Sequence, residues 1–272
     1  MTLNLKSLKA TSTYKPPRVV IYGTSGIGKS TLACQFPKAV AMDIEGGLDG
    51  IHIAKVRVAS YADALQLIKE LYTQEHDFKT LVIDSIDWME GLIHKETADI
   101  YGTEQNKKYK SIEDIPYGKG YARAEPVWDE FLSALTALRD HNGMAIILVA
   151  HSKLEKFSDP SSATYDRYTI DLHTKAAAKV YEWADAVLFA SKQVYVSSED
   201  VGFNKTKKRG VAGNRVLFTE DRPSAIAKNR YSMPEELPLS FDELVKYLPI
   251  KMEDDQLELP TPTEKPTTVK GN

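Results

Sequence analysis

The sequence of 272 residues has a single cysteine, Cys34, which excludes an internal disulfide and a zinc site built from cysteines. It has no apolar run near the roughly 20 residues that a membrane helix requires. The lysines within residues 1–15 are not followed by an apolar stretch, so no secretory signal is expected. These absences favour a reducing, cytoplasmic compartment and no membrane partner.

A strong net charge is also lacking. The chain has 35 Lys and Arg against 38 Asp and Glu, a formal charge of −3, so any contact with nucleic acid must come from local basic patches. Hydrophobic residues make up 42% of the chain, enough for a sizeable core. Residues 250–272 contain five acidic residues, three lysines and many prolines and threonines, which predicts a disordered tail.

Short apolar segments alternate with longer helical ones between these ends. Strands are predicted at residues 18–22, 39–44, 80–84, 144–150 and 186–190, and helices at 29–35, 61–75, 86–100, 122–141 and 173–183. This alternation predicts an α/β fold with a mainly parallel central sheet and helices on both faces.

The pattern changes after residue 190. Strands at 193–197, 214–219 and 225–229 predict a small C-terminal antiparallel β extension, and a short helix is expected over 240–248. We therefore expect an N-terminal arm at 1–16, one core domain at 17–249 and the tail at 250–272.

A complete phosphate-binding loop follows the first strand. Residues 23–31 fit G-x-x-x-x-G-K-[ST] between an apolar strand and a helix. Backbone N–H groups of such a loop surround phosphates, Lys29 reaches the β- and γ-phosphates, and the Ser30 hydroxyl binds Mg²⁺. The predicted ATP-binding residues of this loop are Gly23, Thr24, Ser25, Gly26, Ile27, Gly28, Lys29, Ser30 and Thr31.

A second apolar strand ends in Asp84. A carboxylate at the end of such a strand is placed to bind the magnesium water shell beside Ser30. The same aspartate also fits a helix-capping role before the helix at 86–100, and the two roles are compatible.

The position of the water-activating glutamate separates the classes of P-loop ATPase. Many motors have a glutamate directly after the aspartate, but here Ser85 follows Asp84, and carboxylates instead follow the earlier strand at 39–44. This arrangement resembles the RecA recombinases and their KaiC-like and replicative-helicase relatives. The resemblance implies that Glu45 orients the attacking water, and that Asp49 and His52 contact the adenine, His52 by stacking.

Two later segments resemble the same class. The buried strand at 144–150 is followed by His151, where RecA-like proteins have a Gln or His that senses the γ-phosphate. Lys228 and Arg230 match a pair of cations that reach the phosphates of a neighbouring subunit in RecA-like filaments and rings. Alternate residues of a strand point the same way, so the two can form one clamp acting in trans.

The resemblance covers residues 18–238 and is greatest to compact, core-only phage RecA-like ATPases used as single-strand annealing proteins. It implies a RecA-like P-loop NTPase core that hydrolyses ATP with Mg²⁺, is stimulated by DNA, and anneals or exchanges single-stranded DNA as a filament or ring. A phage-encoded chain would act in the cytoplasm of the bacterial host, and a single-strand-binding protein is an expected further partner.

Three basic segments are candidates for the DNA contact. Residues 102–121 and 152–172 are predicted as long loops in which cations alternate with aromatics, a combination suited to a single strand. A third segment, residues 205–209, is predicted as a basic hairpin tip flanked by Gly202 and Gly210. The candidate residues are Lys107, Lys108, Lys110, Lys119, Lys153, Lys156, Arg167, Lys207, Lys208 and Arg209.

Other interpretations stay open at this point. A ring-type DNA helicase or translocase uses the same core, and a KaiC-like nucleotide switch acts on protein partners without DNA. The site residues also have plainer interpretations: a surface carboxylate for Glu45, a structural histidine for His151, and a solvated strand for Lys228 and Arg230. A small-molecule kinase is less favoured because no lid segment with paired arginines follows the loop.

Overall fold

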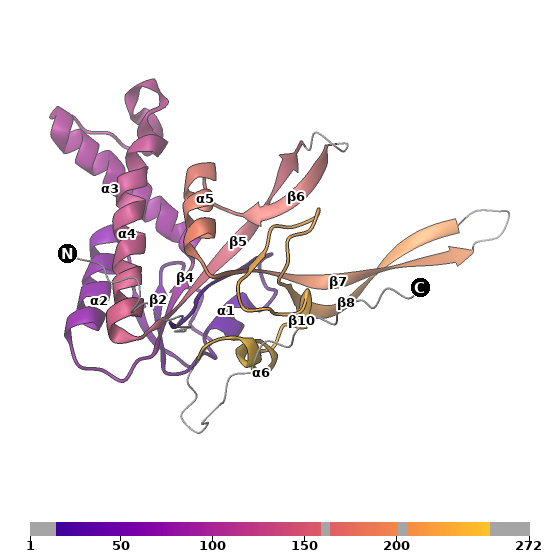
Figure 1. Ribbon diagram of the computed structural model, residues 1–272. Helices are drawn as coiled ribbons and strands as arrows, with labels where there is room; N and C mark the ends of the chain where they lie inside the picture. The colour runs from indigo at the N-terminus through magenta and orange to yellow at the C-terminus, as the bar shows by residue number, and fades with distance from the viewer. Residues whose placement is uncertain (1–14, 159–163, 201–205, 251–272) are drawn as a thin grey trace, which may run out of the picture.

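A computed structural model describes residues 15–158, 164–200 and 206–250, and within them a ten-stranded sheet forms the centre (Figure 1). The main path of the sheet runs β10-β8-β7-β1-β5-β4-β2-β3. Its parallel part comprises β7 (Ala186–Asp200), β1 (Arg18–Gly23), β5 (Ala145–Phe157), β4 (Thr80–Asp84), β2 (Ala39–Asp43) and β3 (Ala54–Arg57). The carboxyl ends of β1, β5, β4 and β2 therefore meet at one edge.

Helices cover both faces of this sheet because successive strand residues point to opposite sides. Val20 and Tyr22 of β1 belong to a core beneath α2 (Tyr61–Thr73), α3 (Ile86–Gln105), α4 (Gly120–Asn142) and α5 (Thr174–Trp183). Val19 and Ile21 belong to a second core beneath α1 (Lys29–Ala33) and α6 (Phe241–Leu244), which continues into a short 3-10 helix, Val245–Tyr247. The predicted α/β class, with helices on both faces, is confirmed.

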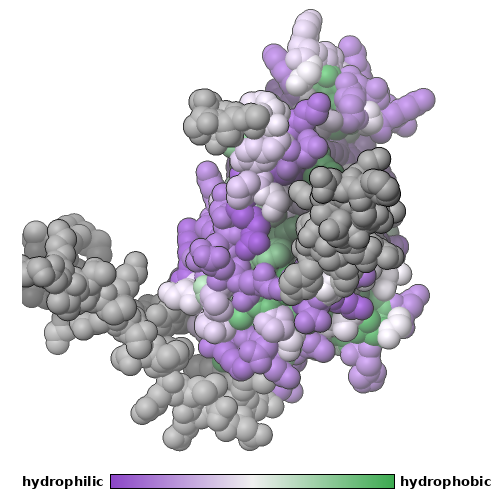
Figure 2. Space-filling view, turned by 90° about the vertical axis from the view of Figure 1, so that its right-hand side faces the viewer, coloured by the Kyte–Doolittle hydropathy of each residue, from purple (hydrophilic) through white to green (hydrophobic). Residues whose placement is uncertain are grey.

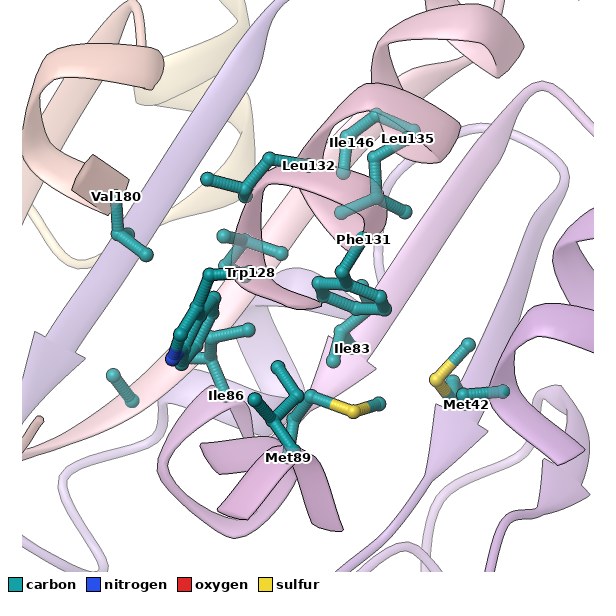
Figure 3. Packing of buried hydrophobic residues seen from close by; sticks show 14 of the residues in the cluster. Met42, Ile83, Ile86, Met89, Trp128, Phe131, Leu132, Leu135, Ile146 and Val180 are labelled. Atoms are coloured by element: carbon teal, nitrogen blue, oxygen red, sulfur yellow. The ribbon is translucent and has the colours of Figure 1, made fainter. Parts of the chain in front are cut away.

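The larger core is centred on α4. Trp128 and Phe131 point from α4 toward Met89 of α3 and Ile83 of the sheet (Figure 3). Their rings pack edge to face with centroids 6.3 Å apart, and both side chains are almost fully buried. Truncating Phe131 to alanine would cost about 3–5 kcal/mol of stability, which is typical of a buried aromatic ring.

Two antiparallel hairpins project from the parallel sheet (Figure 1). β5 continues past the sheet edge and pairs with β6 (Tyr165–Ile170), and β7 continues likewise and pairs with β8 (Thr206–Phe218). β9 (Lys228–Asn229) and β10 (Glu236–Pro238) complete the antiparallel part, which confirms the predicted C-terminal extension. Figure 2 shows the molecule from the side on which these hairpins project, and the coloured surface there is largely hydrophilic.

Several predicted boundaries are wrong. Residues 152–172 are not a loop, because residues 152–157 and 165–170 form the β5–β6 hairpin. Both faces of this ribbon are partly solvated, so its sequence lacks the apolar alternation of a half-buried strand. Residues 193–197 lie within the long β7 rather than in a separate strand, and the late strand is reduced from 225–229 to the two residues of β9.

The segment at 102–121 is also more ordered than predicted. α3 continues to Gln105 and ends at Asn106, whose φ of 51° is left-handed. Two single turns of 3-10 helix, Ile112–Asp114 and Pro116–Gly118, then lead directly into α4. β3 was not predicted from the sequence, because all four of its residues are exposed and none signals a buried strand.

Two further expectations lie almost wholly outside the described residues. These are the N-terminal arm and the C-terminal tail. Within the described part of the chain, no helix combines the length and apolarity needed to cross a membrane.

Candidate nucleotide-binding site

The loop between β1 and α1 has a backbone that demands glycine. Gly26 and Gly28 adopt φ values of 73° and 112°, which residues with a Cβ rarely occupy. A Cβ at Gly23 would stand 2.2 Å from the carbonyl oxygen of Ala190 on β7. The loop therefore turns sharply at the sheet edge and passes directly into the N-terminus of α1, with its N–H groups free to face an anion.

Lys29 is the first residue of α1, and its side chain folds back onto this loop. Its side chain is 5% exposed, and Nζ donates to the carbonyl oxygens of Gly23 and Thr24, each at 2.9 Å. Burial lowers the pKa of Lys29, while the nearby carboxylates, Asp84 first, act in the opposite direction. The loop thus holds a cation in the position where phosphate charge would be bound.

Asp84 ends β4 and faces α1. It is 3% exposed, and its carboxylate accepts a hydrogen bond from the Ser30 hydroxyl. Burial raises the pKa of Asp84, and the hydrogen bond from Ser30 lowers it. A hydroxyl and a carboxylate side by side are the hard oxygen donors that Mg²⁺ prefers.

Ser30 and Asp84 fit a metal ion whose remaining ligands are water and phosphate oxygens. Among the described residues, no cluster of three or more His, Cys, Asp or Glu side chains forms a complete metal site. Mg²⁺ usually keeps several waters and binds phosphates with only one or two protein carboxylates, so Ser30 and Asp84 match its usual demand in nucleotide sites.

Glu45 is positioned by the loop that follows β2. The N–H groups of Ile44 and Glu45 donate to the carbonyl oxygen of Asp84, at 2.8 and 3.3 Å. The Asp43 carboxylate accepts from the N–H of Gly46 at 2.7 Å and closes the turn. Glu45 is half-buried and lines the same pocket as Lys29, so the sequence-distant loop is fixed against the end of β4.

His151 lies on β5, in register with Gly23 at the end of β1. Its Nδ1 lies 2.9 Å from Oδ2 of Asp87, and its backbone N–H donates to the other oxygen of the same carboxylate at 3.0 Å. Asp87 lies in the first turn of α3, three residues after Asp84. One carboxylate therefore fixes both the ring and the backbone of His151.

A pocket of about 330 Å³ brings these groups together. Its polar side chains come from the phosphate-binding loop, α1, the loop after β2, β4, β5 and β8. The lining residues are Ser25, Gly26, Gly28, Lys29, Ser30, Thr31, Glu45, Gly47, Ile51, Asp84, Val149, His151 and Arg215. Sequence reasoning missed Asp87 and Arg215; no motif marks Arg215, whereas Asp87 falls one helical turn after Asp84.

The two predicted adenine contacts do not line this pocket. Asp49 is exposed and forms an ion pair with Lys55 of β3, with Nζ and Oδ1 2.9 Å apart, and this hydrogen bond lowers the pKa of Asp49. His52 is also exposed. Ile51, between them, lines the pocket instead, and the roles of Asp49 and His52 stay predictions.

Lys228 and Arg230 lie away from the pocket of their own chain. Lys228 Nζ donates to the carbonyl oxygens of Tyr181 and Glu182 at the end of α5, at 2.7 and 3.0 Å. Arg230 pairs with Asp185 at 3.1 Å, just before β7. Burial lowers the pKa of Lys228, and the Arg230 charge adds to that effect.

The candidate DNA-binding residues differ in their solvent exposure and in whether their side chains already bond to other residues. Lys107, Lys108, Lys110 and Lys119 are exposed. Lys156 is also exposed, but Lys153 bonds the Leu172 carbonyl and Glu155, and Arg167 pairs with Asp221. Lys207, Lys208 and Arg209 are strand residues of β8 in register with residues 197–199 of β7, not residues of a hairpin tip.

Residues 15–231 match the family described as AAA domain. Among solved structures, the chain is similar to the crystal structure of the RadB recombinase, at 14% identity, over 82% of this chain and 86% of that chain, with a TM-score of 0.45. No curated protein matches.

Proposed function

Because the chain belongs to this AAA domain family and is a P-loop ATPase, we propose that it hydrolyses Mg·ATP within an oligomer and binds single-stranded DNA to promote annealing or strand exchange. The observation that supports this most directly is the pocket itself. Lys29, Glu45, Asp84 and His151 come from four separate elements and converge on one phosphate-binding loop.

The proposed mechanism assigns each side chain a role. Lys29 and the loop N–H groups bind the β- and γ-phosphates and stabilise charge on them. Glu45 accepts a hydrogen bond from the attacking water and orients it toward the γ-phosphate. Ser30 and Asp84 would hold Mg²⁺, which neutralises phosphate charge when bound. His151, fixed by Asp87, contacts the γ-phosphate and reports its presence to β5.

Lys228 and Arg230 would complete the site of a neighbouring subunit. Lys228 pairs with Val187 on β7, whereas the P-loop strand ends at Gly23, level with Ala190 and roughly 10 Å further along the sheet at about 3.3 Å per residue. Both side chains point to α5 and Asp185 rather than toward the loop. This position supports a role in trans and with it an oligomer.

The proposed DNA contact lies between α3 and α4. Tyr117 is 93% exposed and has a φ of 64°, a left-handed conformation that costs about 1–3 kcal/mol for such a residue. The adjoining turn is firmly anchored, because Ile112 and Ile115 are each 2% exposed. A rigidly presented ring among exposed lysines is suited to stacking on a base while cations contact phosphate.

The test combines turnover and binding on the full chain. ATP hydrolysis is measured with and without an oligothymidylate, in the wild type and in Lys29→Ala, and DNA binding is measured over a range of salt. We expect stimulation by the oligonucleotide, loss of turnover in Lys29→Ala, and a fall in log affinity with log salt of about 0.7 per phosphate contact.

Matched lysine variants locate the contact. Replacing Lys107, Lys108 and Lys110 together by alanine should weaken binding and flatten the salt slope by about two. The control replaces three exposed lysines elsewhere: Lys69, Lys79 and Lys95. DNA-independent turnover without single-strand affinity would overturn the DNA proposal and favour a KaiC-like switch, and directional unwinding by a ring would favour a helicase.

A further inference from the structure

Arg215 of β8 reaches the phosphate-binding loop of its own chain. It lines the pocket, and its Nη1 lies 3.4 Å from the carbonyl oxygen of Ile27. The same Nη1 would be 3.3 Å from a Cβ built on Gly28. The guanidinium therefore stands directly beside the residues that precede Lys29.

A local irregularity of the hairpin places Arg215 there. Arg215 is in register with Lys192, but the next paired residues are Val194 and Ala212, so two residues of β8 stand opposite Gln193 alone. Such a β-bulge turns the strand and redirects side chains, and bulges are frequent beside active sites. The strand is also fixed from its other edge, because Leu239 N–H donates to the Arg215 carbonyl at 3.0 Å.

The alternation of side chains along β8 also places Arg215 on the side of the sheet that carries α1. Leu217, two residues after Arg215, is buried in the same core as Ile27 and Leu32 of the loop and α1. Residues two apart on a strand point to the same side of the sheet. The Arg215 side chain therefore lies on the α1 side of the sheet, next to the phosphate-binding loop.

The guanidinium of Arg215 differs from most others in its partners. Six arginines form ion pairs with carboxylates: Arg18, Arg57, Arg123, Arg139, Arg167 and Arg230. Within the part of the chain that the structure describes, no carboxylate forms an ion pair with Arg215, which bonds only the Ile27 carbonyl. A guanidinium has five N–H donors in a planar fork that matches phosphate oxygens, so most of its donors stay available to a ligand.

We propose that Arg215 binds the phosphate chain of the nucleotide held by the P-loop of its own chain. This inference rests on the proposed function, in which that pocket takes ATP. It differs from the proposed role of Lys228 and Arg230, which act on a neighbour. It also ties the nucleotide to the β7–β8 hairpin, because Arg215 and the strand segment of residues 206–212 belong to one continuous β8.

The first experiment measures the affinity of the full chain for ATP and ADP at fixed ionic strength. Arg215→Ala is expected to weaken ATP binding about tenfold, equivalent to about 1.4 kcal/mol, and Arg215→Lys to weaken it less. The control is Lys192→Ala, because Lys192 is an exposed cation opposite Arg215 that does not line the pocket. It should change the affinity less than twofold.

The outcomes separate this inference from the proposed function. ATP binding by the wild type, its loss in Lys29→Ala and its retention in Arg215→Ala would overturn the inference alone. Equal weakening by Lys192→Ala would also overturn it, since the effect would then be one of general charge. Failure of the wild type to bind ATP would overturn the proposed function. If Arg215→Ala does not fold, Arg215→Gln serves the same comparison.

A mixing experiment tests the action in cis. A chain lacking Arg215 and a chain lacking Lys29 each have a defective pocket of their own. Mixing Arg215→Ala with Lys29→Ala at subsaturating ATP should therefore restore no turnover. Restored turnover would show that Arg215 serves a neighbour and would overturn the inference.

Discussion

The Asp87 carboxylate forms two hydrogen bonds with His151, one with the ring Nδ1 at 2.9 Å and one with the backbone N–H at 3.0 Å. Asp87 lies in the first turn of α3, which follows directly after Asp84 at the end of β4, so the start of this helix connects Asp84 to His151. A positioned histidine has one ring nitrogen committed to its partner, which leaves Nε2 for the ligand.

Replacing Asp87 by asparagine should release the histidine ring while keeping a similar side-chain volume. We expect kcat to fall roughly ten- to hundredfold with little change in ATP affinity, because a displaced group loses alignment rather than binding. Steady-state turnover and equilibrium ATP binding separate the two effects. His151→Gln should retain more turnover than His151→Ala, and equal activity of those two variants would contradict a polar role for this position.

Replacing Glu45 by glutamine should remove the carboxylate that we propose orients the attacking water and leave the phosphate-binding loop intact. We expect turnover to fall by about 10²–10⁴ while ATP still binds. Phosphate release measures the first quantity, and nucleotide titration the second. Glu70→Gln, an exposed carboxylate on α2, is the control. A Glu45→Gln chain with full turnover would show that another group activates water.

The proposed role of Arg230 in trans predicts complementation between two inactive chains. Lys29→Ala has a defective pocket but an intact Arg230, and Arg230→Ala has the reverse. In a mixed oligomer, some Arg230→Ala pockets face an intact arginine and should hydrolyse ATP, because the cation is supplied across the interface. Turnover of the mixture above the sum of its parts is the expected result, and a strictly additive mixture contradicts it.

The Arg230 variant needs a folding control, because Arg230 also pairs with Asp185. Its melting temperature should be compared with that of Arg123→Ala, which removes an exposed ion pair with Glu104, because neither of these residues lines the pocket. A drop confined to Arg230→Ala would reflect the Asp185 network, and the mixing result is then read only under conditions where both chains are folded.

Glu90 predicts a pH dependence of stability. Its carboxylate accepts the His173 N–H with both oxygens at 3.0 Å, and burial raises its pKa from 4.5 to about 7. Lys153 of β5 acts against this shift, whereas Asp171 and Asp87 add to it, and His94 lies 3.8 Å away. Between pH 4.5 and 7 the folded chain therefore binds more protons than the unfolded chain, and this residue reduces stability as the pH rises.

Glu90→Gln removes that titration and keeps an acceptor for the His173 N–H. The melting temperature of Glu90→Gln relative to the wild type should rise between pH 4.5 and 7 and level off above. Scanning calorimetry over this range measures the difference. A difference that does not change with pH would show that Glu90 titrates normally.

Most of the parallel sheet was predictable from the sequence, because its strands are buried on both faces and consist of short Val- and Ile-rich runs. Strand β4, 80–84, matches its prediction residue for residue. The phosphate-binding loop and Asp84 were predictable because the loop has the residue spacing that phosphate binding requires and Asp84 stands at the end of a buried strand. Glu45 was singled out because it too follows a strand end, and His151 because the apolar run of β5 ends just before it.

The exposed parts were not predictable in the same way. β3 is only four residues long and wholly exposed, and the outer half of β5 is solvated and has no apolar alternation. The pairing of both is specified by backbone hydrogen bonds that any sequence can make. Arg215 was missed because its place depends on a bulge opposite Gln193, a register detail without a residue signature. Asp87 was missed because its importance comes from His151, which lies 64 residues later.

The network around Asp185 has an unequal charge count. Arg18, Arg139 and Arg230 all contact this carboxylate, and Lys15 and Arg139 share Asp140. Four cations thus meet two carboxylates, an excess of two positive charges among these side chains. A carboxylate or phosphate brought to this corner would be attracted by that excess, and the attraction should weaken as salt is added.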